Sequence, residues 1–278
     1  MNNTILGLLA ETHIHAGIGR TMGAIDLPVS REKPLDYPFI PGSSFKGALR
    51  EAAESKWGLE SDEVNRWFGR QDNAGKLLVG DAKLLALPVR CLNSAAYRWL
   101  TCPLILERYQ RDRRRLGQSA GFDIPEVSLG RLLGADETVK VFLEERLFTG
   151  AGPVTDTVVA AVEECIPLKT ARKRCRRMLA VVNDEDFAWF ARYALPVSAR
   201  NILADETKTS RNLWYEESLP PDTLLWSCII ERGQSKDDPV QGLFGDGTGY
   251  LQAGGNETVG MGWFALHRLG TKEGICRP

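Results

Sequence analysis

The segment between residues 13 and 41 is the strongest local constraint on the fold of this chain. Glycine and proline recur through it at a density that a regular helix does not tolerate, at Gly17, Gly19, Gly23, Pro28, Pro34, Pro38 and Pro41. An apolar run over residues 4–12 precedes it and predicts a first strand. Connections of this length inside a compact chain are usually functional. We therefore expect an irregular connection that carries functional residues.

Helical spacing of apolar residues is confined to a few stretches. Phe45, Leu49 and Trp57 follow the helical period, with a serine cap at 43 or 44 and a stop at Gly58. Further helices are predicted over residues 61–68, 93–116 and 184–193. Residues 75–88 are predicted to form a strand or one arm of a hairpin.

The second half of the chain favours strands. Residues 195–219 predict two strands around a long polar turn at 205–210, so this hairpin should project from the body. Residues 223–230 predict a buried strand and residues 263–266 the last one. Because strands and helices interleave without a steady β-α-β rhythm, the pattern favours an α+β fold.

The overall composition is that of a soluble globular protein, with 43% hydrophobic and 26% charged residues. No apolar run approaches the roughly 20 residues of a membrane span, and no basic region precedes the first apolar stretch, so we expect neither membrane association nor a signal peptide. The six cysteines contain no Cys-x-x-Cys pair. We expect them to be reduced thiols of a cytoplasmic protein.

The net charge of −1 conceals two basic clusters. Five arginines lie within residues 108–115, and five lysines and arginines within residues 172–177. Such stripes on a nearly neutral protein suit a polyanion held along one face. The alternative for each cluster is a solvated helix face.

His13 and His15 follow the first predicted strand. A His-x-His pair at a strand end is how metal-dependent amidohydrolase barrels begin, because side chains at i and i+2 share a face. That chemistry needs further histidines, and His267 is the only other one. We reject the barrel interpretation and expect His13 to be a core or hydrogen-bonding residue.

Asp26 lies in the glycine-rich part of the 13–41 segment, with His15 and Arg20 nearby in sequence. A carboxylate on such a loop could bind a divalent metal, or could position an attacking 2′-hydroxyl against a phosphodiester.

Two further stretches suit phosphate groups. The predicted helix start over residues 41–50 carries Ser43, Ser44, Lys46 and Arg50, and the free N–H groups and dipole of a helix N-terminus attract anions. It lacks P-loop spacing, so a nucleic-acid phosphate fits better than a hydrolysed nucleotide, and an ordinary serine-capped helix is the alternative. The tail contains glycines that allow close approach to phosphates or that form tight turns, namely Gly254, Gly255, Gly260 and Gly262.

These motifs resemble the RAMP superfamily of CRISPR effector complexes, and in particular the repeated backbone subunit of type III-B (Cmr) complexes. The similar segments span nearly the whole chain, at residues 12–17, 23–28, 40–50, 79–82, 213–223 and 255–262. The resemblance implies one RAMP domain over residues 1–278, with a ferredoxin-like (RRM-like) antiparallel sheet core. It also implies helical insertions over about 93–128 and a projecting β-hairpin thumb over about 199–214.

The resemblance further implies a function in antiviral defence. Copies of such a subunit stack into a helical filament along a CRISPR guide RNA, together with other Cmr-complex subunits. Each thumb splays one nucleotide of the guide–target duplex, and complementary target RNA is cut at regular intervals by a metal-dependent endoribonuclease activity. The implied cofactor is a divalent metal, Mg2+ or Mn2+.

The resemblance and the local chemistry together assign roles to individual residues. Asp26 is expected to bind metal or position the hydroxyl, and His15 to give acid–base support. Glu216 and Glu217, at the base of the hairpin, are weaker catalytic candidates. The expected RNA-binding residues are Arg20, Ser43, Ser44, Lys46, Arg50, Gly254, Gly255, Gly260 and Gly262. The alternative function is a structural RNA-binding backbone without catalysis, and residues 172–177 match no family motif.

Overall fold

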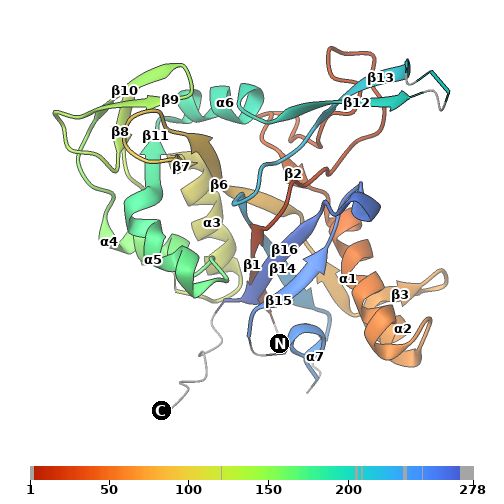
Figure 1. The fold of residues 1–278 in the computed structure, drawn as a ribbon. Helices are drawn as coiled ribbons and strands as arrows, with labels where there is room; N and C mark the ends of the chain where they lie inside the picture. Colours follow the sequence, from red (N-terminus) through yellow and green to blue (C-terminus); the bar gives the residue numbers. More distant parts are fainter. Residues whose placement is uncertain are drawn as a thin grey trace.

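The computed structural model describes residues 3–119, 121–203, 206–207, 209–233, 237–245 and 247–269. One large sheet runs through these residues, in the order β15-β16-β1-β14-β6-β7-β11-β8-β10-β9, with β2 beside β6 and β5 beside β14 (Figure 1). No helix in the described ranges is both long enough and apolar enough to span a bilayer.

The centre of the sheet consists of four antiparallel strands, in the order β16 (Trp263–Arg268), β1 (Thr4–Ala10), β14 (Leu224–Glu231) and β6 (Ala82–Arg90). Every residue of β1 is buried, because the strand lies between two neighbours and is covered on both faces. The strands predicted over 4–12, 223–230 and 263–266 are thus confirmed. The smaller strands near this half are β2 (Phe39–Ile40), β5 (Leu77–Val79) and β15 (Gly249–Gln252).

The other half of the sheet, outside the four antiparallel strands of the expected core, is mixed. It is formed by β7 (Tyr97–Thr101), β11 (Leu179–Val182), β8 (Arg131–Leu133), β10 (Arg146–Gly150) and β9 (Lys140–Leu143). The β7–β11 and β8–β10 pairs are parallel. These residues extend the central sheet, and they include strands where the sequence predicted only helical insertions.

The helix predicted over 93–116 is wrong in its first half. Residues 97–101 form β7, and α3 (Pro103–Arg115) begins only afterwards. Aromatic and β-branched residues favour a pleated, buried surface, and Pro103 at the first helical position fixes the boundary. The prediction extends the helical period of residues 103–115 over residues 93–102, where the chain is not helical.

The helices cover the sheet in two groups. In Figure 1, α1 (Gly42–Trp57), α2 (Asp62–Phe68) and α7 (Pro239–Phe244) lie on one side of the view, and α3, α4 (Asp156–Glu163) and α5 (Lys169–Met178) on the other. Helix α6 (Asp184–Tyr193) matches its predicted bounds, and Ser61 caps α2, since its side chain accepts a hydrogen bond from the Val64 amide.

Helix α1 buries Phe45, Leu49 and Ala53 and ends at Gly58, whose φ of 97° favours glycine. Its predicted serine cap is wrong: Pro41 is the capping residue and provides no side-chain hydrogen bond. The Gly42 amide instead donates to Asp81 Oδ1 at 2.7 Å, so the N-terminal amides of α1 are partly satisfied by a carboxylate from a distant loop.

Strands β12 (Val197–Leu203) and β13 (Ser210–Glu217) form the predicted hairpin as a separate two-stranded sheet. It extends away from the large sheet at the top of Figure 1. The predicted polar turn at 205–210 lies partly outside the described residues. The five cysteines in the described ranges are free and buried.

The segment 13–41 contains no helix and only the short strand β2 (Figure 1). Isolated bridges hold it in place, pairing Ile14 with Leu219, His15 with Gly255, Gly17 with Val29, Leu27 with Glu216, and Arg31 with Pro38. The irregular connection predicted here is confirmed, and its partners lie mostly in the C-terminal part of the chain.

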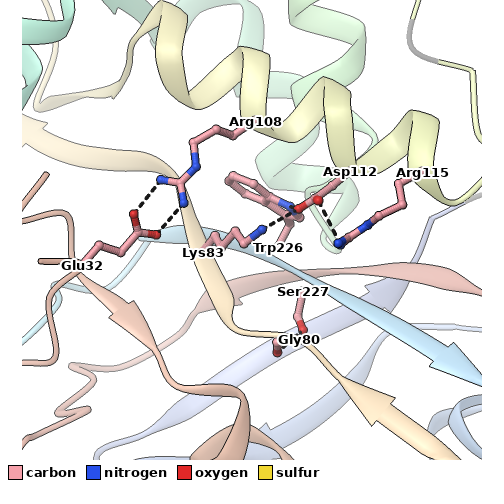
Figure 2. A network of polar contacts seen from close by, with 8 residues as sticks. All are labelled: Glu32, Gly80, Lys83, Arg108, Asp112, Arg115, Trp226 and Ser227. Carbon is pink, nitrogen blue, oxygen red and sulfur yellow. Dashed lines mark hydrogen bonds and ion pairs between the residues drawn. The ribbon is translucent and has the colours of Figure 1, made fainter. Parts of the chain in front are cut away.

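The first arginine cluster belongs to a network of ion pairs between α3 and its surroundings (Figure 2). Arg108 donates to both oxygens of Glu32, at 2.7 and 2.9 Å. Asp112 is buried and accepts from Lys83 at 2.8 Å and from the Trp226 indole at 3.0 Å, and it pairs with Arg115 at 2.9 Å. Arg108 and Arg115 thus pair with acidic residues of the same protein. For the exposed arginines of the cluster, Arg111, Arg114 and Arg115, both interpretations stay predictions.

Replacing Asp112 with asparagine should destabilise the protein by about 2–3 kcal/mol, because Lys83 then lies half-buried without its counterion. Burial raises the pKa of Asp112, but hydrogen bonds from Lys83 and Trp226 outweigh it and lower the pKa. The contribution of the carboxylate is therefore complete above about pH 4 and lost as pH falls through the depressed folded-state pKa. Urea unfolding from neutral to acid pH measures both effects.

The matched control is Glu107→Gln on the same helix, which removes an exposed ion pair with Arg111 at 3.6 Å. It should cost less than about 0.5 kcal/mol. Equal losses in the two variants would show that the buried network does not stabilise the fold.

Candidate functional site

The loop that carries Asp26 is attached to the inner end of the hairpin. The Leu27 amide donates to the Tyr215 carbonyl, and the Glu217 amide donates to the Leu27 carbonyl, both at 3.0 Å. The loop thus pairs with β13 through one parallel bridge, between Leu27 and Glu216. Its position is determined by strand pairing with residues that lie far away in sequence.

Asp26 is half-buried at this junction. Its Oδ2 accepts a hydrogen bond from the Tyr215 amide at 2.8 Å. Thr21 closes the loop, since its amide donates to the Asp26 carbonyl and its hydroxyl to the Ile25 carbonyl, both at 2.8 Å. Oδ1 of Asp26 accepts no hydrogen bond within the described ranges, so one carboxylate oxygen remains available to a ligand.

Glu217 anchors the next part of the loop. It is only 3% exposed, and its carboxylate accepts from the Val29 amide at 3.1 Å and from Arg31 at 2.6 Å. Arg31 also donates to the carbonyls of Asp36 and Ala191, each at 2.7 Å. The pair therefore connects the loop, the hairpin and α6, and each oxygen of the buried carboxylate accepts one structural hydrogen bond.

Glu216 connects a different set of elements. It is 3% exposed and accepts a hydrogen bond from the Asn256 side chain. His15 and Arg200 lie 3.8 and 3.6 Å from its carboxylate oxygens. His15 Nδ1 is 2.7 Å from the Glu217 carbonyl, which can only accept, so this nitrogen carries the proton. His15 is 9% exposed, and a Cβ on Gly17 would meet its Nε2 at 2.4 Å.

The glycine-rich tail packs directly on His15. The Gly255 amide donates to the His15 carbonyl at 2.8 Å. Gly254 has a φ of 104°, and a Cβ there would lie 2.8 Å from that same carbonyl oxygen. Gly262 is similarly confined, whereas Gly260 faces open space. Close packing accounts for Gly254 and Gly262, and the predicted approach of a phosphate stays a prediction for all four glycines.

Lys46 and Arg50 lie at a second place, a cavity of about 290 Å3 beside β5 and the β3 (Gly69–Arg70)–β4 (Asn73–Ala74) turn. Lys46 donates to the Leu77 carbonyl at 3.2 Å, and Arg50 pairs with Glu54 at 2.7 Å. Arg70 and Arg232 also line this cavity. Burial, together with Arg50 and Arg232, lowers the pKa of Lys46, as expected where cations gather with few counterions.

The remaining predicted residues are dispersed. Arg20, Ser43 and Ser44 are exposed. The basic cluster at 172–177 lies on α5, and part of it is paired within the protein. Arg172 bonds to the Ile166 carbonyl and to His267, and Arg176 pairs with Asp156. The side chains of Lys173, Arg174 and Arg177 are exposed.

The structure thus brings together Asp26, His15, Glu216, Glu217 and the glycine-rich tail at the root of the hairpin. Sequence reasoning missed three residues that organise this site, namely Arg31, Arg200 and Asn256. Asn256 had a local signal, because an asparagine within a glycine-rich turn often adopts the left-handed conformation, and its φ is 66°. In the part of the chain that the structure describes, no group of three or more His, Cys, Asp or Glu side chains is arranged to hold a metal.

The model of the RAMP superfamily matches residues 8–265. The chain belongs to the RAMP superfamily. It is 34% identical to the CRISPR-system Cmr endoribonuclease Cmr4 of Pyrococcus furiosus, over 95% of this chain and 94% of that protein. It is 23% identical to the CMR subunit Cmr4 of Saccharolobus solfataricus, over 94% of each chain.

Solved structures share the fold of this chain. The crystal structure of oligomeric Cmr4 from Pyrococcus furiosus superposes with a TM-score of 0.77 and 30% identity, covering 97% of this chain and 98% of that one. A chain of the type III-B Cmr-beta complex bound to cognate target RNA has a TM-score of 0.76 at 21% identity, covering 96% and 97% of the two chains, which shows a shared fold.

Replacing Glu217 with glutamine should loosen the Asp26 loop, because Arg31 loses its counterion while the hairpin ladder stays. We expect a loss of about 2 kcal/mol in the free energy of unfolding. Relative to the wild type, hydrogen exchange should speed up more at the Leu27 and Val29 amides than at the amides of β1. Glu54→Gln, which breaks the more exposed Arg50 pair, should leave exchange in this loop unchanged. Unaltered exchange in the Glu217 variant would contradict the anchoring role.

Proposed function

We propose that this RAMP protein is the repeated backbone subunit of a type III-B CRISPR effector that binds guide RNA and cleaves complementary target RNA in a metal-dependent reaction. The observation that carries the proposal is Asp26, which is held at the hairpin root with one carboxylate oxygen available. The relationship to Cmr4 over nearly the full chain supports it. The proposed partners are guide RNA, target RNA, further copies of this chain and other Cmr subunits, in the cytoplasm.

The topology supports a ferredoxin-like core. The order β16-β1-β14-β6 is that of a four-stranded βαββαβ sheet in which α1 connects the first two strands of the motif and α7 precedes the last. We assign the hairpin β12–β13 as the thumb, because it is a two-stranded arm separate from this core.

In the proposed reaction the 2′-oxygen of a target nucleotide attacks the adjacent phosphorus and the 5′-oxygen leaves. Regular RNA helices do not align these atoms, so a hairpin that splays a nucleotide supplies orientation, which is worth several kcal/mol. Asp26 Oδ1 is placed to accept a hydrogen bond from the hydroxyl or to bind a cation. The fit to a hard divalent ion such as Mg2+ is reasonable, because such ions often use one protein carboxylate together with phosphate oxygens and water. When bound, the ion would supply charge stabilisation.

Burial distinguishes the roles of the other acidic and imidazole groups. The carboxylates of Glu216 and Glu217 are enclosed and already bonded, so we assign them positioning roles. His15 donates through Nδ1 to a carbonyl and is mostly enclosed, so acid–base support from it requires RNA to reach Nε2 beside Gly17.

One observation favours the second candidate function, a structural RNA-binding backbone without catalysis. The carboxylate of Asp26 accepts a hydrogen bond from the Tyr215 amide. A residue with a purely structural role in the loop could make the same bond. The two candidate functions make the same prediction for RNA binding and opposite predictions for cleavage.

Asp26→Asn separates the two functions. Asparagine keeps an oxygen acceptor for the Tyr215 amide but loses the charge, so assembly and target binding should stay within about twofold while cleavage falls by roughly 10²–10⁴-fold. The measurement is cleavage of labelled complementary RNA by the reconstituted complex with and without Mg2+. Asp36→Asn, the same substitution elsewhere in the 13–41 segment, is the control. Cleavage at the wild-type rate by the Asp26 variant would establish the structural-backbone function instead.

The double variant Lys46→Ala, Arg50→Ala should bind guide RNA more weakly and with a shallower salt dependence. Each phosphate contact that is lost lowers the log–log salt slope by roughly one unit. Lys33→Ala with Lys140→Ala removes two exposed charges that lie outside both basic clusters and is the charge-matched control. If both double variants change the slope equally, the effect is one of net charge and the cavity beside β5 is no RNA site.

A further inference from the structure

A groove of about 270 Å3 lies between helix α1 and the end of the large sheet at β15 and β16. Helix α1 and β15 contact each other (Figure 1). The helix lines the groove with the small residues Ala48 and Ala52 and with Glu51, and the strands line it with Tyr250 and Trp263. None of these residues has a role in the RNA binding or cleavage described above, so the groove requires its own explanation.

The strand side of the groove is an aromatic wall. Tyr250 is 56% exposed and Trp263 40% exposed. Gln252 pairs with Trp263 across the ladder and lies two residues from Tyr250, so both rings are on the same face of the two strands. The Gln252 side chain donates to the Glu257 and Met261 carbonyls, at 3.0 and 2.8 Å, which fixes the adjacent turn against this wall. The faces of such rings attract cations.

The charge in the groove is acidic. Glu51 and Glu257 both line it and are exposed, and neither carboxylate makes an ion pair or a hydrogen bond within the described ranges. No lysine or arginine of the described residues lines the groove, whereas Lys46 and Arg50 line the cavity beside β5. Helix α1 therefore separates a basic cavity from an acidic groove. RNA phosphates suit the first and are repelled by the second.

Strand β15 forms the end of the large sheet, with β16 as its one strand partner in the part of the chain that the structure describes. The Ala253 amide donates to the Gly262 carbonyl at 2.9 Å. Because hydrogen bonding alternates along an antiparallel ladder, the backbone groups of Tyr250 and Gln252 point away from β16. A sheet edge of this kind can accept an extended segment as a further strand.

We propose that this groove docks an extended, basic segment of another protein, which pairs with β15 and places a lysine or arginine side chain against Tyr250 and Trp263. Charge complementarity selects the occupant, since two carboxylates without counterions border the aromatic wall. Main-chain hydrogen bonds to the strand edge would supply affinity, and the side chain in the groove would supply specificity. This protein-docking site goes beyond the proposed function and does not depend on RNA cleavage.

The test selects ligands from a random heptapeptide library displayed on phage, with the purified full chain as the target. We expect the enriched peptides to contain lysine or arginine, because these side chains match the charge and the rings of the groove. Fluorescence anisotropy with labelled synthetic copies of the enriched peptides then measures their affinity. A selection that enriches no peptide, or only peptides without basic residues, would overturn the proposal.

Matched variants place the binding site. Glu51→Lys should weaken peptide binding about tenfold through charge repulsion, whereas Glu137→Lys makes the same change at an exposed acid outside the groove. Tyr250→Ala should weaken binding about fivefold by removing one ring, and Tyr193→Ala removes another exposed tyrosine as its control. Both controls should stay within twofold of the wild type. Equal losses in a variant and its control, with all four folded as judged by thermal unfolding, would contradict the groove site.

N-methylated peptides test the pairing with β15. Methylation of alternate backbone amides should abolish binding in one register and leave it intact in the other, because one edge of the added strand faces β15. Binding that survives methylation in both registers would overturn strand pairing.

The same variant distinguishes the other occupants of the groove. Tyr250→Ala should leave both the affinity for guide RNA and the self-association of the chain in sedimentation velocity unchanged. Loss of RNA binding would assign the groove to RNA, and loss of self-association would assign it to a second copy of this chain. Either result would overturn the proposal.

Discussion

The attachment of the 13–41 segment to the inner end of β13 is the interaction on which the functional site depends. This segment has almost no regular structure, and two backbone hydrogen bonds of 3.0 Å and the buried Glu217–Arg31 pair fix its place. Since desolvated charge is costly unless paired and hydrogen-bonded, the Glu217 carboxylate holds the Val29 amide and Arg31 together as one unit. The position of Asp26 follows from these bonds.

The pairing of basic residues inside the fold determines which cations of this chain are left to attract a polyanion. Arg108, Arg113 and Arg115 pair with Glu32, Glu164 and Asp112, so most of the first cluster pairs within the protein. Cations with fewer acidic neighbours gather instead beside β5, at Lys46, Arg70 and Arg232. Charge that is paired within the fold does not contribute much to a field that attracts a polyanion.

The sequence predicted those parts of the fold that short-range periodicity determines. The strands at both ends, α1, α2, α6 and the hairpin follow from apolar spacing and from stop signals such as Gly58. Strand β7 was missed because its apolar run merges with the helical period of α3, and tertiary pairing with β6 and β11 decides the outcome. Asp26 could be found because a glycine-rich loop isolates it, whereas Arg31 and Arg200 act through partners far away in the sequence.

Glu216 and Glu217 position two different parts of the chain from one strand. They are adjacent on β13: Glu217 holds the Asp26 loop through Val29 and Arg31, and Glu216 lies beside Arg200 and contacts Asn256 in the glycine-rich tail. Alternation along a strand places adjacent side chains on opposite faces, so one short piece of β13 contacts the loop from one face and the tail from the other. Under the proposed function, the hairpin that displaces a nucleotide and the loop that carries Asp26 therefore share this strand as their common support.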